Sequence, residues 1–213
     1  MSSVLGMSSV IAIDGPAAVG KGTLAKAMAQ HLNFAYLDTG KLYRAVGVRA
    51  AAQGQLAEAT SIAHGLTVDD LAHPALRTPA AARYASEVAV QPGVRQALLA
   101  FQRDFGRTPP GGKAGAVLDG RDIGTVIFPD ADLKLFITAS AEVRARRRYK
   151  ELPPETRPAF DDLLRQVQDR DARDAHRDTA PMVAAADAHL IDTSDLDTQA
   201  VLNLALSIWA QSR

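Results

Sequence analysis

Apolar residues along the chain fall into five short runs, and each run ends in a polar residue or a glycine-containing turn. The runs cover residues 10–14, 34–38, 116–119, 133–138 and 189–192. Segments with the apolar spacing of amphipathic helices separate most of these runs. Strands that alternate with helices predict an α/β fold, in which a mainly parallel sheet carries helices on both faces. Ligands of such sheets bind beyond the carboxyl ends of the strands, where the polar residues lie.

The first run leads into a glycine-bounded turn, and a helical pattern begins at Lys21. The spacing G-x-x-x-x-G-K between a strand and a helix is typical of a phosphate-binding loop. Backbone N–H groups of such a loop surround a polyphosphate, the helix N-terminus adds positive potential, and Lys21 binds the β- and γ-phosphates. We therefore predict a nucleotide phosphate site whose residues are Gly15, Pro16, Ala17, Ala18, Val19, Gly20, Lys21, Gly22 and Thr23.

Two residues are candidates for contact with Mg²⁺. Gly22 stands where many phosphate loops carry a serine or threonine, and Thr23 follows one place later, so this ligand is supplied less directly. Asp119 ends the third apolar run. An acidic residue at such a strand end often helps to hold Mg²⁺ through water. We expect Mg²⁺ to accompany ATP, with Asp119 as a water-mediated contact and Thr23 as a weaker candidate.

A second anion site is indicated beyond the second and third runs. Thr39 lies where a strand gives way to a helix, and Arg44 lies about one turn into that helix. The pair fits a second phosphate as well as it fits an N-cap and a surface charge. Arg121 follows Asp119, and its place at a strand end favours contact with phosphate or substrate over a plain ion pair.

Residues 48–85 are alanine-rich and predict helices and loops with only a short candidate strand at 66–68. Residues 80–102 are helical in pattern, with a break at Pro92-Gly93. Ser86 and Arg95 flank that break and can converge on a pocket, although each in isolation fits a plain surface residue.

Two arginine clusters flank a proline-rich tip at residues 152–158. The first contains Arg144 and Arg148, which share a helical face. The second places Arg170, Asp174 and Arg177 at i, i+4 and i+7. As a structural alternative, the spacing of the second cluster fits intrahelical salt bridges worth about 0.2–0.5 kcal/mol each. For the first cluster, a patch that binds nucleic acid is also conceivable. A helical hairpin that closes arginines over transferring phosphates is the functional interpretation.

Composition narrows the function classes. The 213 residues suit one core domain, and 24 basic against 24 acidic side chains disfavour a general partner of nucleic acid or anionic membranes. The chain contains no cysteine, which is compatible with a cytoplasmic location, and no apolar run approaches a membrane span. Local basic clusters without a general base fit phosphoryl transfer to a phosphate monoester, which is already ionised near neutral pH.

Four segments together resemble one family: IDGPAAVGKGT, LDTGKLYR, LDGRDIGTVIFPDA and RDARDAHRDTAP. They are similar to the bacterial cytidylate kinases, the (d)CMP kinase branch of the nucleoside monophosphate kinases. The resemblance extends from about residue 10 to the C-terminal helix. It implies a five-stranded parallel core with a monophosphate-binding region and a lid. It also implies transfer of the ATP γ-phosphoryl group to CMP or dCMP with Mg²⁺.

The resemblance also implies roles for individual residues. The catalytic set is Lys21, Arg121, Arg144, Arg148 and Arg170. The set that binds CMP is Thr39, Arg44 and Arg121 at its phosphate, Ser86, Arg95, Asp122 and Arg177 around the cytosine, and Arg170 and Asp174 at the sugar. The Gly22-Thr23 ending matches the loop variant of this group, in which waters and the nucleotides hold most of the Mg²⁺.

One kinase domain is expected, with a core at residues 8–47, 114–143 and 182–213, a monophosphate-binding region at about 48–113 and a lid at about 144–181. Longer family members carry a small antiparallel sheet between the motifs at Arg44 and Ser86. Here only about forty residues separate the two motifs and contain no convincing hairpin, so we expect that sheet to be missing in part or completely. The expected partners are the substrates ATP and CMP or dCMP, and we expect the protein to be a monomer.

Other interpretations stay open at this point. The nearest is a kinase of the same architecture that acts on UMP, AMP or a non-nucleotide acceptor. From another class, a nucleotide-dependent switch or a nucleic-acid-linked ATPase shares the phosphate loop. Zero net charge and the lack of interleaved aromatic residues disfavour the latter. A catalytically inactive binding module is the third alternative. The presence of Lys21, Asp119 and Arg121 disfavours it.

Overall fold

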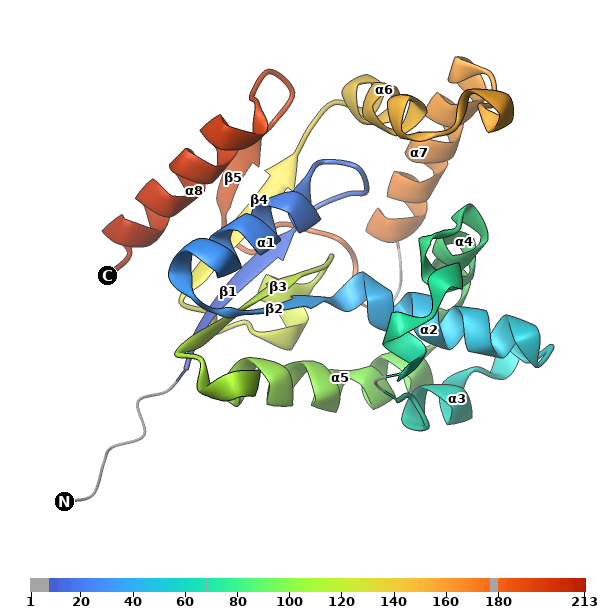
Figure 1. The fold of residues 1–213 in the computed structure, drawn as a ribbon, viewed down its shortest axis with the longest axis horizontal. Coiled ribbons are helices and arrows are strands. Elements are labelled where there is room, and N and C mark those ends of the chain that lie inside the picture. The colour runs from blue at the N-terminus through green and yellow to red at the C-terminus, as the bar shows by residue number, and fades with distance from the viewer. Residues whose placement is uncertain (1–7, 68, 177–179) are drawn as a thin grey trace. The chain divides into compact units, whose positions relative to one another are not determined.

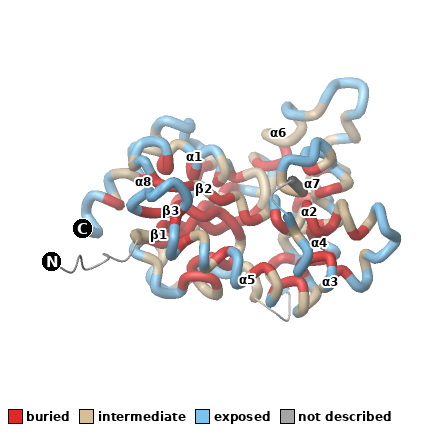
Figure 2. The backbone as a smooth tube through the Cα atoms, turned by 60° about the horizontal axis from the view of Figure 1, so that its bottom comes forward, coloured by how far each residue is buried: buried red, intermediate tan, exposed pale blue. Residues whose placement is uncertain are grey.

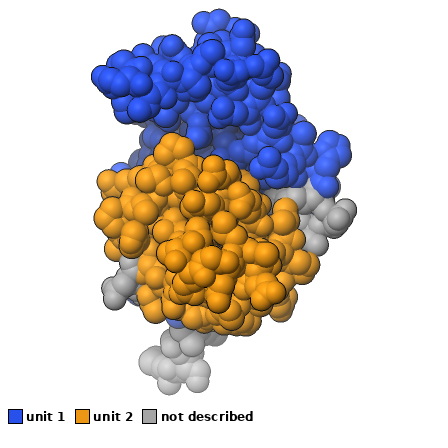
Figure 3. Space-filling view, turned by 90° about the vertical axis from the view of Figure 1, so that its right-hand side faces the viewer, with its two compact units in different colours: residues 1–36, 106–213 blue, residues 37–105 orange. Residues whose placement is uncertain are grey.

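The computed structural model describes residues 8–67, 69–176 and 180–213 (Figure 1). The chain forms two compact units (Figure 3). The sheet unit comprises Met1–Tyr36 and Gly106–Arg213, and the helical unit comprises Leu37–Phe105.

The sheet has five strands in the order β2-β3-β1-β4-β5, and it confirms the predicted α/β fold. The strands are β1 (Ser9–Asp14), β2 (Ala35–Asp38), β3 (Gly115–Asp119), β4 (Leu133–Thr138) and β5 (His189–Asp192), within a residue of the five apolar runs. β1 pairs in parallel with β3 and β4, and β4 pairs in parallel with β5. The register places Ile13 opposite Asp119, so the carboxyl ends of β1 and β3 lie side by side.

Two helices of the sheet unit cover one face of the sheet, α1 (Lys21–Leu32) and α8 (Thr198–Gln211) (Figure 1). β1 and β3 are almost completely buried along their length (Figure 2). Alternate residues of the strands, among them Ile11, Ile13 and Leu135, pack into one cluster with Met28 and other residues of α1 and α8. Burial of this apolar area is the main stabilising term of the unit.

A helical hairpin of α6 (Ala141–Glu151) and α7 (Phe160–Ala175) belongs to the same unit. A short 3₁₀ turn at Pro154–Thr156 lies at its tip, and the two helices pack against each other. Leu163 and Val167 are buried on the apolar face predicted for α7. The predicted hairpin is confirmed, whereas its movement as a lid stays a prediction.

The helical unit contains α2 (Thr39–Ala52), α3 (Thr60–His64), α4 (Pro79–Val88) and most of α5 (Pro92–Arg107). Its 3₁₀ turns are Leu56–Glu58, Asp69–Ala72 and Pro74–Arg77. Besides the turn at the tip of the hairpin, the sheet unit contains a 3₁₀ turn at Pro110–Gly112 and a π-helical turn at Ile123–Ile127. α2 and α4 pack closely at Gly47, where a Cβ atom would lie 2.7 Å from the Cβ of Tyr84.

Two expectations about the helical unit need correction, and one is confirmed. Leu66 and Thr67 form no strand, and Val68 of that candidate lies outside the described residues. The break between α4 and α5 falls at residues 89–91 rather than at Pro92-Gly93, because proline suits the first position of a helix. Over the described part of residues 39–105 there is no strand at all, as expected from the missing hairpin.

Candidate nucleotide-binding site

The phosphate loop connects β1 to α1 and requires glycine at its first position. Gly15 has φ 138°, and a Cβ atom there would lie only 2.0 Å from the carbonyl oxygen of Ile137. Gly20 has φ 91° and precedes α1, whose first backbone bond runs from the N–H of Leu24 to the Gly20 carbonyl at 3.0 Å. The structure therefore confirms the strand, turn and helix that the spacing predicts.

Three side chains, one from the loop itself and two from remote segments, bind carbonyl oxygens of the loop. The bonds run from Lys21 Nζ to Pro16 O at 2.8 Å, from Arg144 Nη1 to Ala17 O at 3.3 Å and from Thr193 Oγ1 to Val19 O at 3.2 Å. Between these carbonyls lies Ala18, which adopts the left-handed conformation with φ 61°. A loop whose carbonyls are bound elsewhere can keep its N–H groups for an anion.

Lys21 is buried and lies within the electrostatic influence of four charged side chains. Burial, followed by repulsion from Arg121, lowers the pKa of Lys21 to about 7, against the attraction of Asp119 and Asp14. Arg170 adds further repulsion. The structure thus brings three predicted catalytic cations together, and their mutual repulsion favours a polyanionic ligand among them.

Asp14 is a site residue that the sequence reasoning missed. Its carboxylate accepts hydrogen bonds from the backbone N–H groups of Ile123 at 2.8 Å and Gly124 at 2.7 Å. These are N–H groups at the start of the π-helical turn, which a side chain must satisfy. Burial raises the pKa of Asp14 to about 6, although the two backbone bonds lower it. The available signal was an acidic residue at the end of an otherwise apolar strand.

Asp119 is buried beside the loop, as expected for a metal-related carboxylate. Its Oδ1 accepts a hydrogen bond from Tyr36 Oη at 2.9 Å, and its Oδ2 lies 3.7 Å from the position of a Cβ atom on Gly22. Thr23 instead lines a pocket together with residues of α8. The described residues contain no group of three or more acidic or histidine side chains for a metal ion. One carboxylate near phosphate oxygens and waters nevertheless suits Mg²⁺, which retains several waters.

Arg121, Arg170 and Asp174 form one ionic cluster in the sheet unit. Arg121 Nε donates to Asp174 Oδ2 at 3.1 Å, and Arg170 Nε lies 3.9 Å from the same oxygen. Asp122, the neighbour of Arg121, is also buried. Arg177, the fifth residue predicted in this neighbourhood, lies outside the described residues.

The two predicted lid arginines of α6 differ in their surroundings. The guanidinium of Arg144 is buried and bonded to Ala139 O, Ala17 O and the carboxylate of Asp171. Arg148 is only half-buried, and its side chain makes no hydrogen bond or ion pair with the described residues. Only Arg148 therefore has its donors open to a phosphate in this conformation.

The helical unit holds the remaining predicted residues. Asp38, not Thr39, is the N-cap of α2, since its side chain accepts from the N–H of Lys41 at 3.1 Å. Arg44 Nη2 binds the same Asp38 at 2.7 Å and keeps part of its surface exposed. The capping alternative for Thr39 is therefore wrong.

Ser86 and Arg95 are not surface residues, since each is only 8% exposed. Ser86 Oγ donates to Ala82 O at 3.3 Å, and Arg95 donates to Ala89 O at 3.4 Å and lies over the ring of Tyr43. Polar side chains are rarely buried to this extent without a reason in packing or binding. Their burial favours the pocket interpretation over the surface alternative.

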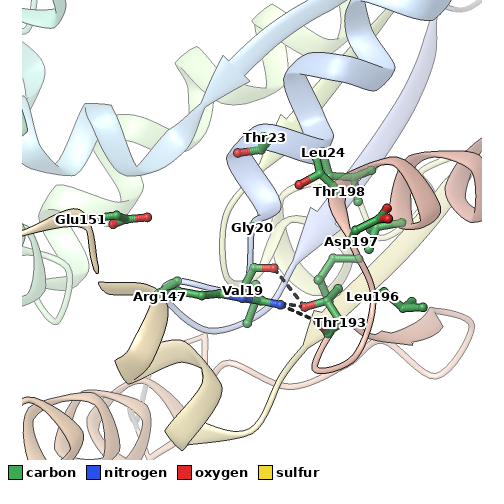
Figure 4. Close-up of a pocket in the computed structure, with 13 residues that line it drawn as sticks. Val19, Gly20, Thr23, Leu24, Arg147, Glu151, Thr193, Leu196, Asp197 and Thr198 are labelled. Carbon is green, nitrogen blue, oxygen red and sulfur yellow. Dashed lines mark hydrogen bonds between the residues drawn. The ribbon is translucent and has the colours of Figure 1, made fainter. Parts of the chain in front are cut away.

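A cavity of about 420 Å³ opens beside the loop and was not predicted (Figure 4). Its lining comes from the loop, β4, α6 and the segment around the start of α8: Ala18, Val19, Gly20, Thr23, Leu24, Ile137, Arg147, Glu151, Thr193, Leu196, Asp197, Thr198 and Val201. Arg147 donates to Thr193 Oγ1 at 3.1 Å and to its carbonyl at 2.5 Å. The volume and the mixture of apolar and polar lining are typical of small-molecule sites.

A phosphate loop after the first strand of a five-stranded parallel sheet defines a phosphate-loop nucleotide-binding protein. The fold agrees with solved structures of low sequence identity. A shikimate kinase from Bacteroides thetaiotaomicron has a TM-score of 0.51 and 13% identity, covering 95% of this chain and 97% of that chain. An uncharacterized protein from Eubacterium ventriosum ATCC 27560 has a TM-score of 0.54 and 13% identity, with 96% and 99% covered. These likenesses concern the fold alone.

The cytidylate kinase family model matches residues 11–211. Cytidylate kinase of Paramagnetospirillum magneticum is 54% identical over 212 residues, covering 97% of this chain and all (100%) of that protein. Cytidylate kinase of Rhodospirillum rubrum is 52% identical over 206 residues, with 94% and 97% covered. The chain belongs to the cytidylate kinase family, which confirms the resemblance found in the four motifs. None of the described helices has the length and apolar character needed to cross a membrane.

Proposed function

We propose that this chain transfers the γ-phosphoryl group of ATP to CMP or dCMP, and that the products are ADP and CDP or dCDP. The observation that carries the proposal is the grouping of Lys21, Arg121 and Arg170 at the phosphate loop, where the two arginines add to the effect of burial in lowering the pKa of Lys21. Family membership supports the choice of acceptor. A transferring phosphoryl group spreads its charge over three oxygens, and such a group of cations stabilises that charge.

The donor is ATP, bound by the loop from Gly15 to Thr23. Its phosphates accept hydrogen bonds from the loop N–H groups, and their negative charge restores the protonated form of Lys21. The cavity beside the loop then receives the nucleoside part of ATP, because it adjoins Gly20 and has the size of a small-molecule site. Arg147 and Thr193 supply polar groups at its wall.

The residues proposed for the acceptor are those that the family resemblance implies. Thr39, Arg44 and Arg121 bind its phosphate, and Arg170 and Asp174 meet its sugar. The residues that surround the cytosine are Ser86, Arg95, Asp122 and Arg177. The burial of Thr39, Ser86, Arg95, Asp122 and Asp174 supports binding roles for these polar side chains.

No residue acts as a general base in this mechanism. The acceptor oxygen belongs to an ionised phosphate, so the protein must align the two phosphates and stabilise charge rather than remove a proton. Lys21, Arg121, Arg148 and Arg170 supply that positive charge. Arg144 belongs to the catalytic set that the resemblance implies, but its guanidinium is bonded to Ala139, Ala17 and Asp171 within the protein. Closure of the α6–α7 hairpin excludes water and so suppresses hydrolysis of ATP.

Mg²⁺ bound with ATP supplies charge neutralisation at the phosphate oxygens. Asp119 is the residue of this chain that would hold it, through water, and Tyr36 donates a hydrogen bond to the Asp119 carboxylate. Thr23 is the weaker candidate because it lines the cavity. A cytoplasmic location and a monomeric state remain predictions, and the latter can be measured by light scattering.

The decisive experiment is an acceptor panel in a coupled assay of ADP release. CMP and dCMP are expected to be phosphorylated far faster than UMP or AMP. The absence of a β-hairpin from the described helical unit makes UMP the most informative competitor. Comparable rates for all four acceptors would refute the cytosine assignment. Hydrolysis of ATP that is stimulated by RNA or DNA, without any monophosphate, would favour a nucleic-acid-linked ATPase.

A further inference from the structure

Arg144 joins three parts of the sheet unit through one guanidinium. Its Nε donates to Ala139 O at 3.0 Å, just beyond the end of β4. Its Nη1 donates to Ala17 O in the phosphate loop at 3.3 Å and to Asp171 Oδ1 on α7 at 3.0 Å. Its Nη2 donates to the second oxygen of Asp171. Four of the five N–H donors of the side chain are thus engaged within the protein.

This ion pair differs from the two exposed pairs of the hairpin. Arg144 is 4% exposed and meets Asp171 in the two-pronged geometry that arginine and carboxylate prefer. Arg146 with Glu142 and Arg165 with Asp162 are pairs between mostly exposed side chains. Exposed pairs contribute little, whereas removal of one partner from a buried pair leaves an uncompensated charge.

The contact with Ala17 reaches the loop at its most constrained point. Ala18, the next residue, holds φ 61° without being glycine, a conformation that is costly for an L-residue and persists only when neighbouring contacts hold it. Arg144 holds the carbonyl before Ala18, and Thr193 holds the carbonyl after it. Both bonds occupy carbonyl oxygens of the loop with donors from the protein.

We propose that Arg144 and Asp171 are positioning residues, which together fix the phosphate loop at Ala17 and couple its shape to α7. α7 also carries Arg170 and Asp174, so the pair links the donor loop to the helix that meets the acceptor. Arg144 acts through the loop and does not contact the transferring phosphates. The inference rests on the proposed function for its kinetic consequence, but not for its effect on binding of ATP.

The test uses Asp171→Asn in the full-length chain, because this substitution separates the two roles of Arg144. If Arg144 positions the loop, loss of the Asp171 charge releases it from Ala17. The Kd for ATP then rises about 10- to 100-fold, while the Kd for CMP changes far less. If Arg144 instead binds phosphate directly, the substitution frees its donors, and the Kd for ATP falls or stays unchanged. Isothermal titration of each nucleotide gives both constants, and the second result overturns the proposal.

A double-mutant cycle with Arg144→Gln adds an independent criterion. Residues that act only as a pair give a double variant no worse than the worse single variant. Additive losses in kcat/KM for ATP would contradict the proposal. Asp162→Asn is the matched control, since it neutralises an arginine-paired carboxylate on the same helix but at a mostly exposed site. Its Kd for ATP is expected within about twofold of the parent value.

Asp171→Asn leaves a buried positive charge and can prevent folding. In that event the doubly apolar variant Arg144→Met with Asp171→Leu restores a packed interior, which circular dichroism and thermal melting verify. This folded variant still lacks the donor to Ala17 O, so its Kd for ATP is expected to rise about tenfold. An unchanged Kd in the folded variant overturns the proposal. Failure of the unsubstituted chain to phosphorylate CMP would instead refute the proposed function, while leaving the ATP titrations interpretable.

Discussion

The phosphate loop and the helical unit hold their candidate ligand-binding groups in different ways. The loop depends on backbone conformation: Gly15 fits only without a Cβ atom, and side chains from distant segments bind its carbonyls. The helical unit instead presents side chains on packed helices, with Thr39 on α2, Ser86 on α4 and Arg95 on α5.

The difference indicates which part of the molecule can vary. A polyphosphate site built from backbone groups loses its shape when a constrained position such as Gly15 acquires a side chain. A site made of side chains on helices changes with each substitution while the helices stay packed. We therefore expect loss of activity from changes at the loop and altered acceptor preference from changes in the helical unit.

The largest effect is expected from Lys21→Ala, which removes the cation at the centre of the loop. Turnover is expected to fall about a thousandfold, as for loss of a group that stabilises transition-state charge. The fold should persist, because the substitution removes a buried charge whose pKa is already lowered to about 7. Steady-state kinetics with circular dichroism measure both. Lys26→Ala, an exposed lysine on the same helix, is the control and should stay within about twofold.

The second prediction concerns the dependence of stability on pH, and it separates Asp14 from Lys21. Burial raises the pKa of Asp14 from 3.8 to about 6, so the folded chain binds more protons than the unfolded chain between these values. Stability should therefore decline as the pH rises from about 4 to about 6, by roughly 3 kcal/mol for this group alone. Lys21 acts in the opposite sense, since its pKa is lowered to about 7 from 10.5 and stability should rise with pH between these values.

Urea denaturation of the ligand-free chain at intervals of pH measures these slopes. Asp14→Asn should remove the decline below pH 6, and Lys21→Met should remove the rise above pH 7. The slope, rather than the absolute stability, is the readout, because Asp14→Asn also replaces an acceptor of two backbone bonds. An unchanged slope in either variant would contradict the assigned group.

Asp174→Ala tests the ionic cluster of Arg121, Arg170 and Asp174. It removes the partner of Arg121 and the proposed contact with the sugar. We expect kcat/KM for CMP to fall about 30-fold, with little change in the Kd for ATP. Asp169→Ala, an exposed carboxylate on the same helix, provides the comparison. Unchanged kinetics with both CMP and dCMP would exclude Asp174 from the acceptor site.

The smallest effect is expected from Ser86→Ala in the helical unit. Loss of one buried hydroxyl should lower the preference for CMP over UMP, measured as the ratio of kcat/KM values, by about five- to tenfold. Total turnover with ATP should change less than the ratio. Ser61→Ala, on the exposed side of α3, should leave the ratio unchanged. A fall in turnover without any change in preference would assign Ser86 to packing instead.

Much of the sheet unit could be predicted from local pattern. Each strand was a short apolar run, and the loop was a spacing of glycine and lysine within seven residues. The helical unit was harder, because its alanine-rich segments carry weak periodicity. Pro92 was interpreted as a break, although it begins a helix.

The sequence by itself determined the fold class, the phosphate loop, the family motifs and, for the described residues between Arg44 and Ser86, the lack of a hairpin, since all of these depend on residues close together in the chain. Only the tertiary structure decided which polar side chains are buried and with which partners. Asp14 binds N–H groups that lie 109 and 110 positions further along the chain, and Arg144 binds Ala17 across 127 positions. The physical reason is that a charged side chain gains or loses its role through desolvation and long-range partners, and packing of remote segments sets both.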